Sequence, residues 1–395
     1  MKTRRVLQPR VAGFRLMLWA LLAISISLGM DGQVRGESLE PIRIASAFSA
    51  TGPLSTQNVW SFSVVRLAAR TVNSQGGVLG RPIELIELDT QSTPLGARQA
   101  ALEAVRAGVT AVIGPSFSSQ AMAMGPVLQE AGIPMIGTNT TAPAVTRIGE
   151  YVFRASFTDE SQAMAMANFA HDHLKARTVA VLHIVDDLYS EGLSSVFVEL
   201  FTALGGKSVL QLPYLLSDTD FSRQISMIKE ADPDLVFLPG HARDSGMILK
   251  QARAMGLAVP FLGGDGWSAL EAYPHLTPDW GDVYYASHWH SARDTEPSRA
   301  FQRILAQEFG EDASMVLISA RANDFDALGL VADAIRRAGS ADPKAVRDAL
   351  AMTVKYPGVT GEISFQDSRD PLKPVYILRI TQDAIEHVTS VEPKL

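Results

Sequence analysis

The chain has 395 residues, of which 47% are hydrophobic and 19% are charged, a composition typical of a globular protein with two or three domains. It contains no cysteine, which excludes thiol catalysis, disulfide bonds, cysteine-ligated metal and a lipid-modified cysteine anchor. The net charge is −7, and because residues 1–36 contribute +5, the remainder is near −12. This balance does not favour nucleic acid or an anionic membrane as a partner.

The first 36 residues have the pattern of an export signal. An apolar run over residues 16–30 follows five basic residues, which are Lys2, Arg4, Arg5, Arg10 and Arg15. A membrane span needs about 20 apolar residues, so this shorter run predicts a cleaved secretory peptide, 1–36, with Gly29 or Gly36 near the cleavage site. An uncleaved anchor is the alternative, and residues 3–7 are weakly similar to a twin-arginine signal.

Strand-like and helix-like segments alternate along the rest of the chain. In the first run we expect strands at 42–48, 83–88, 111–113 and 134–136, with helices at 58–73 and 95–107. A second run gives helices at 160–174, 191–204, 221–230 and 243–255, with strands at 179–184, 209–214, 235–238 and 260–262. Later elements are strands at 283–287, 363–365 and 375–381 and helices at 297–309, 320–338 and 343–351. This repeated alternation predicts an α/β fold with two doubly wound parallel sheets.

Two strands of the first run end in loops rich in hydroxyl groups. The strand at 111–113 stops at Gly114 and Pro115, and Ser118 and Ser119 are placed to cap the helix that follows. The strand at 134–136 opens into residues 137–141 in the same way. A helix start offers unpaired N–H groups and partial positive charge, and open α/β sheets bind ligands at the carboxyl ends of their strands. We therefore expect an anionic group to bind here.

Motifs for catalysis and nucleotide binding are missing or incomplete in the sequence. No Gly-x-Ser-x-Gly occurs, which removes one large class of serine hydrolase. Residues 205–208 have the tail of a phosphate loop, but Phe201 stands where its first glycine is needed. Residues 264–269 fit a dinucleotide turn, but the carboxylate of Asp265 would lie beside the pyrophosphate. His288 and His290 could share a face and bind metal, but they lack a third ligand at a supporting distance, so we interpret them as loop or solvent-facing histidines.

A small-molecule binding site is the interpretation that remains. Ser118, Ser119, Asn139 and Thr141 would hold an anionic group, and Asp265, which follows a strand, would meet a cation. Helix capping and turn formation are the structural alternatives for these residues. A carboxylate at one end and an ammonium at the other is the charge pattern of a free α-amino acid, whose buried charges need such partners. No metal or other cofactor is expected.

Short motifs in a specific order carry a resemblance to a known family. They are Gly52-Pro53-Leu54, residues 75–80, Val112-Ile113-Gly114 with Ser118-Ser119, residues 131–134, Thr141-Ala142-Pro143, residues 219–222, residues 250–253, residues 263–266 and Val359-Thr360-Gly361. Over nearly all of residues 41–381 the chain resembles the periplasmic solute-binding proteins of the leucine/isoleucine/valine-binding family. The resemblance implies two α/β lobes joined by three crossovers, with lobe 1 at 41–156 plus 286–371 and lobe 2 at 157–285 plus 372–395.

The resemblance also implies roles for individual residues. Ser118 and Thr141 match ligands of the carboxylate, assisted by the backbone at Asn139, and Asp265 matches the acid that meets the α-ammonium. Tyr189 matches a tyrosine of the cleft, although Ser190 stands where glycine is usual.

Three further positions concern the side-chain pocket. His241 occupies a place where an aromatic residue is common, and Phe325 stands where tyrosine is common. Gln57 lies where leucine-binding members have an apolar aromatic residue, which implies that a polar or amide-bearing ligand is accepted.

The function implied by the resemblance is that of an exported, non-enzymatic binding protein. It would capture a small ligand in the periplasm, an aliphatic or other neutral amino acid, and deliver it to the permease and ATPase of an ABC importer. A ligand-sensing receptor of the same fold, a binder of amides, urea or aromatic acids, and an exported hydrolase are the alternatives.

Overall fold

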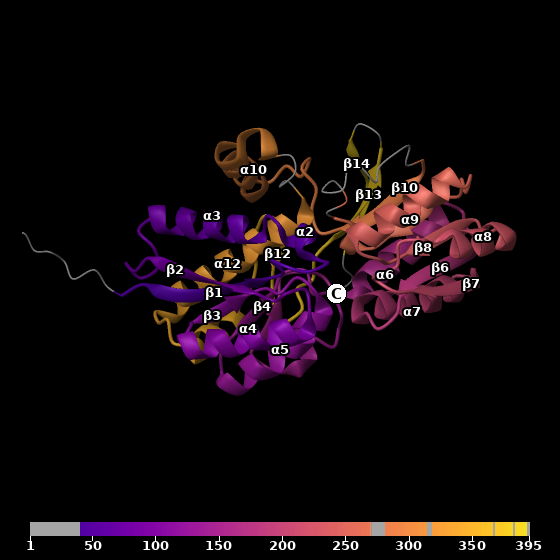
Figure 1. Cartoon of the computed structure of the whole chain (residues 1–395). Helices are drawn as coiled ribbons and strands as arrows, with labels where there is room; N and C mark the ends of the chain where they lie inside the picture. The colour runs from indigo at the N-terminus through magenta and orange to yellow at the C-terminus, as the bar shows by residue number, and fades with distance from the viewer. Residues whose placement is uncertain are drawn as a thin grey trace, which may run out of the picture. The chain divides into compact units, whose positions relative to one another are not determined.

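A computed structural model describes residues 40–268, 270, 281–313, 318–365, 368–381 and 384–392. The export signal predicted at residues 1–36 lies outside this range. In the described part of the chain the larger strands form two sheets, each with helices on both faces (Figure 1). None of the helices in these ranges is long and apolar enough to cross a membrane.

The first sheet is parallel throughout, in the order β2-β1-β3-β4-β5. Its strands are β1 (Ile42–Phe48), β2 (Ile83–Asp89), β3 (Ala111–Ile113), β4 (Met135–Gly137) and β5 (Val152–Arg154). Its helices are α2 (Ser55–Asn58), α3 (Ser61–Ser74), α4 (Pro94–Ala107), α5 (Ser118–Ala131), α12 (Ser319–Ala338) and α13 (Pro343–Ala351). Successive residues of β1 face opposite layers, with Ile44 packed toward α3 and α12 and Ala45 toward α4 and α5. Burial on both faces explains why the strand is apolar from Ile44 to Phe48 except at Ser46.

The second sheet has the order β14-β13-β10-β9-β8-β6-β7. Its strands are β6 (Thr178–Ile184), β7 (Lys207–Tyr214), β8 (Leu235–Leu238), β9 (Phe261–Gly263), β10 (Val283–Ser287), β13 (Val375–Ile380) and β14 (Ile385–Val391). Helices α6 (Asp159–Asn168) and α7 (Leu188–Ala203) cover one face, and α8 (Ser222–Ala231) and α9 (Ala242–Ala254) cover the other. The last two strands run antiparallel to their neighbours: β13 enters from the first lobe and not through a βαβ unit of this sheet, and only four residues separate it from β14.

The chain passes between the two sheets three times: after β5, after β10 and before β13. The second crossover carries α10 (Glu296–Phe309), whose Phe301 and Leu305 pack against Val64 and Leu67 of α3. The third follows a small hairpin of β11 (Tyr356–Gly358) and β12 (Gly361–Ile363). The fold is therefore that of two doubly wound lobes, as the sequence predicted.

Most predicted elements appear within a few residues of their expected bounds, with three kinds of difference. The helix predicted at 58–73 is split into α2 and α3. In the helix predicted at 160–174, the α-helical part α6 stops at Asn168 and a π-helical segment continues over Phe169–His173. Strands β5, β11 and β14 were not predicted, since β5 and β11 have only three residues each and β14 is mostly polar and exposed. The late strand predicted at 363–365 forms instead at Gly361–Ile363.

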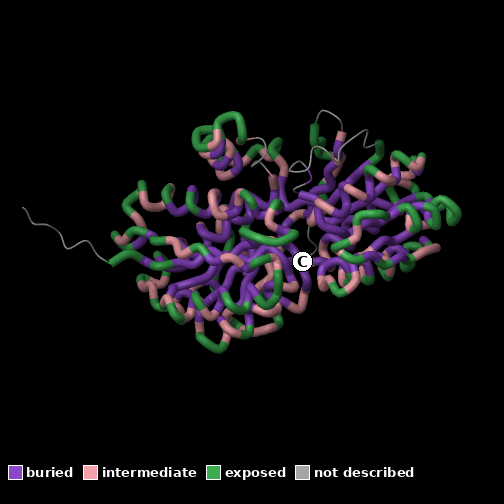
Figure 2. Tube along the Cα trace, viewed as in Figure 1, coloured by how far each residue is buried: buried purple, intermediate pink, exposed green. Residues whose placement is uncertain are grey.

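Buried segments run through both sheets and the helices packed on them, as Figure 2 shows, and Phe237 of β8 is fully buried in an interior strand of the second sheet. Its ring stacks on that of Phe197 from α7, with centroids 3.8 Å apart. We expect Phe237→Ala to lower the free energy of unfolding by about 3–5 kcal/mol, the usual cost of deleting a buried aromatic ring. Chemical denaturation measures this change.

The matched control is Leu95→Ala, which removes a large apolar side chain that is 66% exposed. It should change the free energy of unfolding by less than about 0.5 kcal/mol. Equal effects of the two substitutions would contradict the packing described for the second sheet.

Candidate functional site

Loops from both lobes line one cavity rich in polar side chains, whose empty space is about 450 Å³ with open solvent included. The first lobe contributes Gln57, Asn58, Ser116, Phe117, Ser118 and Asn139, together with Ala320 and Arg321 from the start of α12. The second lobe contributes Tyr189, His241, Asp265, Gly266 and Ser268. Most of these residues follow the carboxyl ends of β3, β4, β6, β8 and β9, where parallel sheets bind ligands.

The start of α5 forms one wall of the cavity. The cap residue is Phe117, whose side chain makes no capping bond, so the prediction that Ser118 and Ser119 cap this helix was wrong. Ser118 is instead the first helical residue, and its hydroxyl accepts a hydrogen bond of 3.2 Å from the backbone N–H of Ala142. The first N–H groups of a helix have no acceptor within it and carry partial positive charge. This wall therefore suits an anion.

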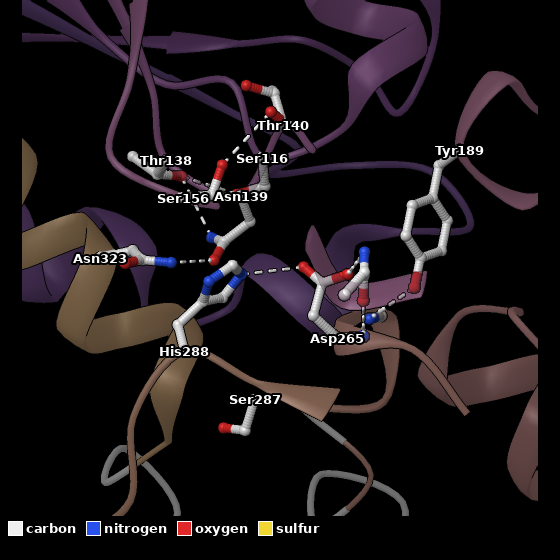
Figure 3. A network of polar contacts seen from close by, with 12 residues as sticks. Ser116, Thr138, Asn139, Thr140, Ser156, Tyr189, Asp265, Ser287, His288 and Asn323 are labelled. Carbon is white, nitrogen blue, oxygen red and sulfur yellow. Dashed lines mark hydrogen bonds and ion pairs between the residues drawn. The ribbon is translucent and has the colours of Figure 1, made fainter. Parts of the chain in front are cut away.

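The loop after β4 adds Asn139 beside this wall. The side-chain carbonyl of Asn139 accepts a hydrogen bond of 3.0 Å from Asn323, which points toward it from α12 (Figure 3). Its amide nitrogen donates to the hydroxyl of Thr138 at 3.2 Å. Ser116 joins the same network, because its hydroxyl accepts from Asn58 at 3.0 Å and lies 3.3 Å from that of Thr138. The polar groups here are held in fixed orientations.

Asp265 forms the opposing wall from the second lobe. Its side chain is 5% exposed and accepts two hydrogen bonds of 3.0 Å, one from the amide of Gln162 and one from Nε2 of His288 (Figure 3). Burial lowers the pKa of His288 although Asp265 opposes the shift, so the imidazole is neutral and donates its Nε2–H. The carboxylate is thus oriented without a neighbouring cation in contact with it.

The glycines before Asp265 allow other side chains to approach closely. A Cβ on Gly263 would lie 2.2 Å from the ring of Trp267, and one on Gly264 would lie 2.2 Å from the hydroxyl of Tyr189. That hydroxyl accepts a hydrogen bond of 3.0 Å from the backbone N–H of Gly266. The Gly-Gly-Asp-Gly sequence therefore serves the packing of this wall.

Aromatic rings complete the cavity. The imidazole of His241 stacks on Tyr189 with centroids 5.6 Å apart, and Phe117 of the first lobe meets it edge-on at 5.2 Å. Burial lowers the pKa of His241, but the carboxylate of Asp187, 3.3 Å from Nε2, more than offsets this and raises the pKa overall. Asp187 thus favours the protonated form of the His241 imidazole within a largely buried pair.

A second carboxyl group lies behind Asp265. Asp159 is fully buried, and the amide of Gln162 donates to it at 2.8 Å while also donating to Asp265. Burial, reinforced by the charge of Asp265, raises the pKa of Asp159 to about 8. At neutral pH Asp159 is therefore largely protonated and adds little negative charge behind Asp265.

Arg321 brings a guanidinium to the cavity from the first turn of α12. Nη1 donates to the hydroxyl of Ser61 at 2.6 Å, Nη2 donates to the carbonyl of Gln57 at 3.1 Å, and Nε lies 3.1 Å from the carboxylate of Asp324. Both Arg321 and Asp324 are buried, at 2% and 0% exposure. The charge is thus compensated inside the protein.

The cavity brings together six of the predicted site residues: Gln57, Ser118, Asn139, Tyr189, His241 and Asp265. Ser119, Thr141 and Phe325 do not line it. Thr141 is buried beside it, where its carbonyl accepts from the N–H of Asp159, and Phe325 packs on Phe301 with centroids 5.2 Å apart.

Sequence reasoning missed Asn58, Ser116, Gln162, His288 and Arg321. His288, interpreted as a loop or solvent-facing residue, follows β10 but is 1% exposed and binds Asp265. A positively charged side chain in the first turn of a helix is disfavoured by the helix dipole. The position of Arg321 near the start of the predicted helix could therefore have indicated that this residue has a specific partner.

An α/β protein whose two lobes line a shared polar cavity belongs to the class of two-lobed ligand-binding proteins. Residues 41–384 match the periplasmic binding protein family, and the chain belongs to this family. It is 27% identical over 333 residues to the leucine-, isoleucine-, valine-, threonine-, and alanine-binding protein of Pseudomonas aeruginosa, covering 84% of this chain and 87% of that one.

Two solved structures are also similar. The leucine-binding protein LivK of Thermotoga maritima has a TM-score of 0.82 at 29% identity, covering 89% of this chain and 99% of that one. The branched-chain amino acid substrate-binding protein LivJ of Streptococcus pneumoniae, in complex with isoleucine, has a TM-score of 0.84 at 27% identity, covering 89% and 100%.

The pKa of Asp159 predicts how stability depends on pH. A carboxyl group whose pKa is higher in the folded state adds stability below its unfolded pKa, near 4, and that stability is lost as the pH rises through about 8. Asp159→Asn removes this titration and keeps a carbonyl for Gln162. We expect the stability of the variant relative to the native protein to increase between pH 5 and pH 8.5, as measured by urea unfolding.

The control is Asp312→Asn, which changes an exposed aspartate. Its stability relative to the native protein should be the same at both pH values. If Asp159→Asn also gave a constant difference, the buried carboxyl pair would not be titrating as described.

Proposed function

We propose that the chain is an exported binding protein that captures a free α-amino acid in the periplasm and delivers it to an ABC importer. The observation that carries this proposal is the polarity of the cavity. Asp265 presents a carboxylate from the second lobe, and the start of α5 presents partially positive N–H groups from the first. A zwitterion complements both ends.

The anionic end of the ligand would lie at α5. The hydroxyls of Ser116 and Ser118 and the amide of Asn139 line the cavity there, and no lysine is among the lining residues. Backbone N–H groups at a helix start and side-chain hydroxyls hold a carboxylate without a full positive charge. Such an arrangement binds the carboxylate through hydrogen bonds and not through an ion pair.

The ammonium end would lie at Asp265. A carboxylate has about four lone-pair sites, and His288 and Gln162 occupy one each, so acceptor capacity remains for a ligand N–H group. With His288 neutral and Asp159 protonated, this end of the cavity carries a net negative charge. A buried charge is costly unless it is paired, and a ligand ammonium would provide the pairing.

Transport would follow from contacts that both lobes make with the ligand only when they close on it. The relatives from Pseudomonas aeruginosa and Streptococcus pneumoniae carry names of amino-acid-binding proteins, and a role in transport implies a membrane permease and an ATPase as partners. The predicted leader at residues 1–36 agrees with export. The residues proposed to contact the ligand are Gln57, Ser118, Asn139, Tyr189, His241 and Asp265, with Ser119 and Thr141 supporting the anionic end.

Calorimetric titration with a panel of amino acids, after removal of any bound ligand, tests this function. We expect at least one amino acid to bind, and Asp265→Asn to weaken that binding by about 1.5–3 kcal/mol, the scale of a charge-assisted hydrogen bond. The exposed Asp312→Asn is the control and should leave affinity unchanged.

Two results would contradict the proposal. The first is binding of an uncharged amide or an aromatic acid with no binding of any amino acid. The second is unchanged affinity in Asp265→Asn, which would mean that Asp265 only shapes the turn after β9.

A further inference from the structure

A third part of the cavity wall has no role in holding the amino and carboxyl groups of an amino acid. It consists of Gln57 from α2 and of Ala320 and Arg321 from the start of α12. Of the amino acids in the names of the relatives, leucine, isoleucine, valine and alanine have side chains without a hydrogen-bonding group, and threonine has a single hydroxyl. A polar wall at this place therefore calls for its own explanation.

Gln57 is 7% exposed, and its side-chain nitrogen is buried without a hydrogen-bond partner among the described residues. A buried amide donor without an acceptor is destabilising, and such groups are rare in folded proteins. Because Gln57 lines the cavity, a ligand can supply the missing acceptor. Its amide donor favours an oxygen atom on the ligand.

Arg321 has donors to spare at the same wall. Of its five N–H groups, one on Nη1 is donated to Ser61 and one on Nη2 to Gln57, while Nε faces Asp324. Each terminal nitrogen thus keeps one N–H that has no acceptor in the described part of the chain. Guanidinium N–H groups in this arrangement match the oxygens of a carboxylate or an amide carbonyl.

The contact between the two residues fixes their arrangement. The backbone carbonyl of Gln57 accepts from Arg321, so the helix start of α12 and the short helix α2 are tied together at the cavity. Asp324 balances the charge of Arg321, and a neutral amide or a carboxylate can therefore be accommodated. The shared requirement is an acceptor oxygen.

Building on the function proposed above, we propose that the ligand is an amino acid whose side chain ends in a carbonyl or carboxylate oxygen, recognised by Gln57 and Arg321. An aliphatic side chain would leave both donors buried and unpaired. A site built to hydrogen-bond a polar group discriminates strongly against an analogue that lacks it. The proposed specificity of this chain therefore differs from the specificity for leucine, isoleucine and similar amino acids that the names of its relatives state.

Calorimetry with four ligands tests this specificity: L-glutamine and L-glutamate carry the acceptor, and L-methionine and L-leucine are of similar size without it. We expect glutamine or glutamate to bind at least about 10-fold more tightly than methionine and leucine, as the loss of a hydrogen bond to a buried donor requires. The ratio of glutamine to glutamate affinity distinguishes an amide from a carboxylate ligand.

The variant Gln57→Leu removes the amide and keeps the size of the side chain. We expect it to lower the affinity for the polar ligand by about 10-fold or more and to leave leucine binding equal or stronger. The matched control Gln99→Leu changes an exposed glutamine on α4 and should alter neither the affinity for the polar ligand nor that for leucine.

The variant Arg321→Lys keeps the charge beside Asp324. It should weaken binding of the polar ligand and leave binding of leucine unchanged.

The outcomes separate this inference from the function on which it rests. Tighter binding of leucine or methionine would overturn the inference and leave the amino-acid function intact. An equal loss of affinity for all four ligands in Gln57→Leu would also overturn it, since the side chain of Gln57 would then only support the fold. Failure of every amino acid to bind would overturn both.

Discussion

The hydrogen bonds that orient Asp265 are the constraint on which the site depends. They join a residue after β9 to Gln162 of α6 and to His288 after β10, which lie 103 and 23 residues away from Asp265 in the sequence. The neutral imidazole and the amide hold the carboxylate in place without cancelling its charge. A cation from outside the protein can then complete the pairing.

The crossover segments connect this arrangement to the first lobe. The ring of Phe157 lies on His288 with centroids 3.7 Å apart, and Lys373 donates to the carbonyl of Ala155 at 2.7 Å and to Asn323 at 3.1 Å. Asn323 in turn donates to Asn139. Burial lowers the pKa of Lys373 to about 7, although the charge of Asp326 opposes this shift. The amino group that makes these contacts is therefore partly deprotonated at neutral pH. One hydrogen-bond network thus connects the segments that link the lobes to Asn139, on the side of the cavity proposed to bind the ligand's carboxylate.

The sequence predicted much of the fold, and less of the site. Apolar runs such as β8 were recognisable because both faces of the sheet are covered, and Asp265 could be found because it follows a strand end. His288 and Arg321 could not be placed in this way. Their burial depends on partners that only folding supplies, such as Ser61, which is 260 residues from Arg321. Phe325 was assigned by position in the resemblance, whereas its ring packs on Phe301 in the apolar core.

The most direct measurement of the central claim is a crystal structure of the protein with its amino-acid ligand bound. The account predicts a ligand nitrogen about 2.7–3.2 Å from a carboxylate oxygen of Asp265, with the ligand carboxylate at Ser118 and the first turn of α5. A bound ligand whose nitrogen meets other groups, with Asp265 in contact only with His288 and Gln162, would contradict it.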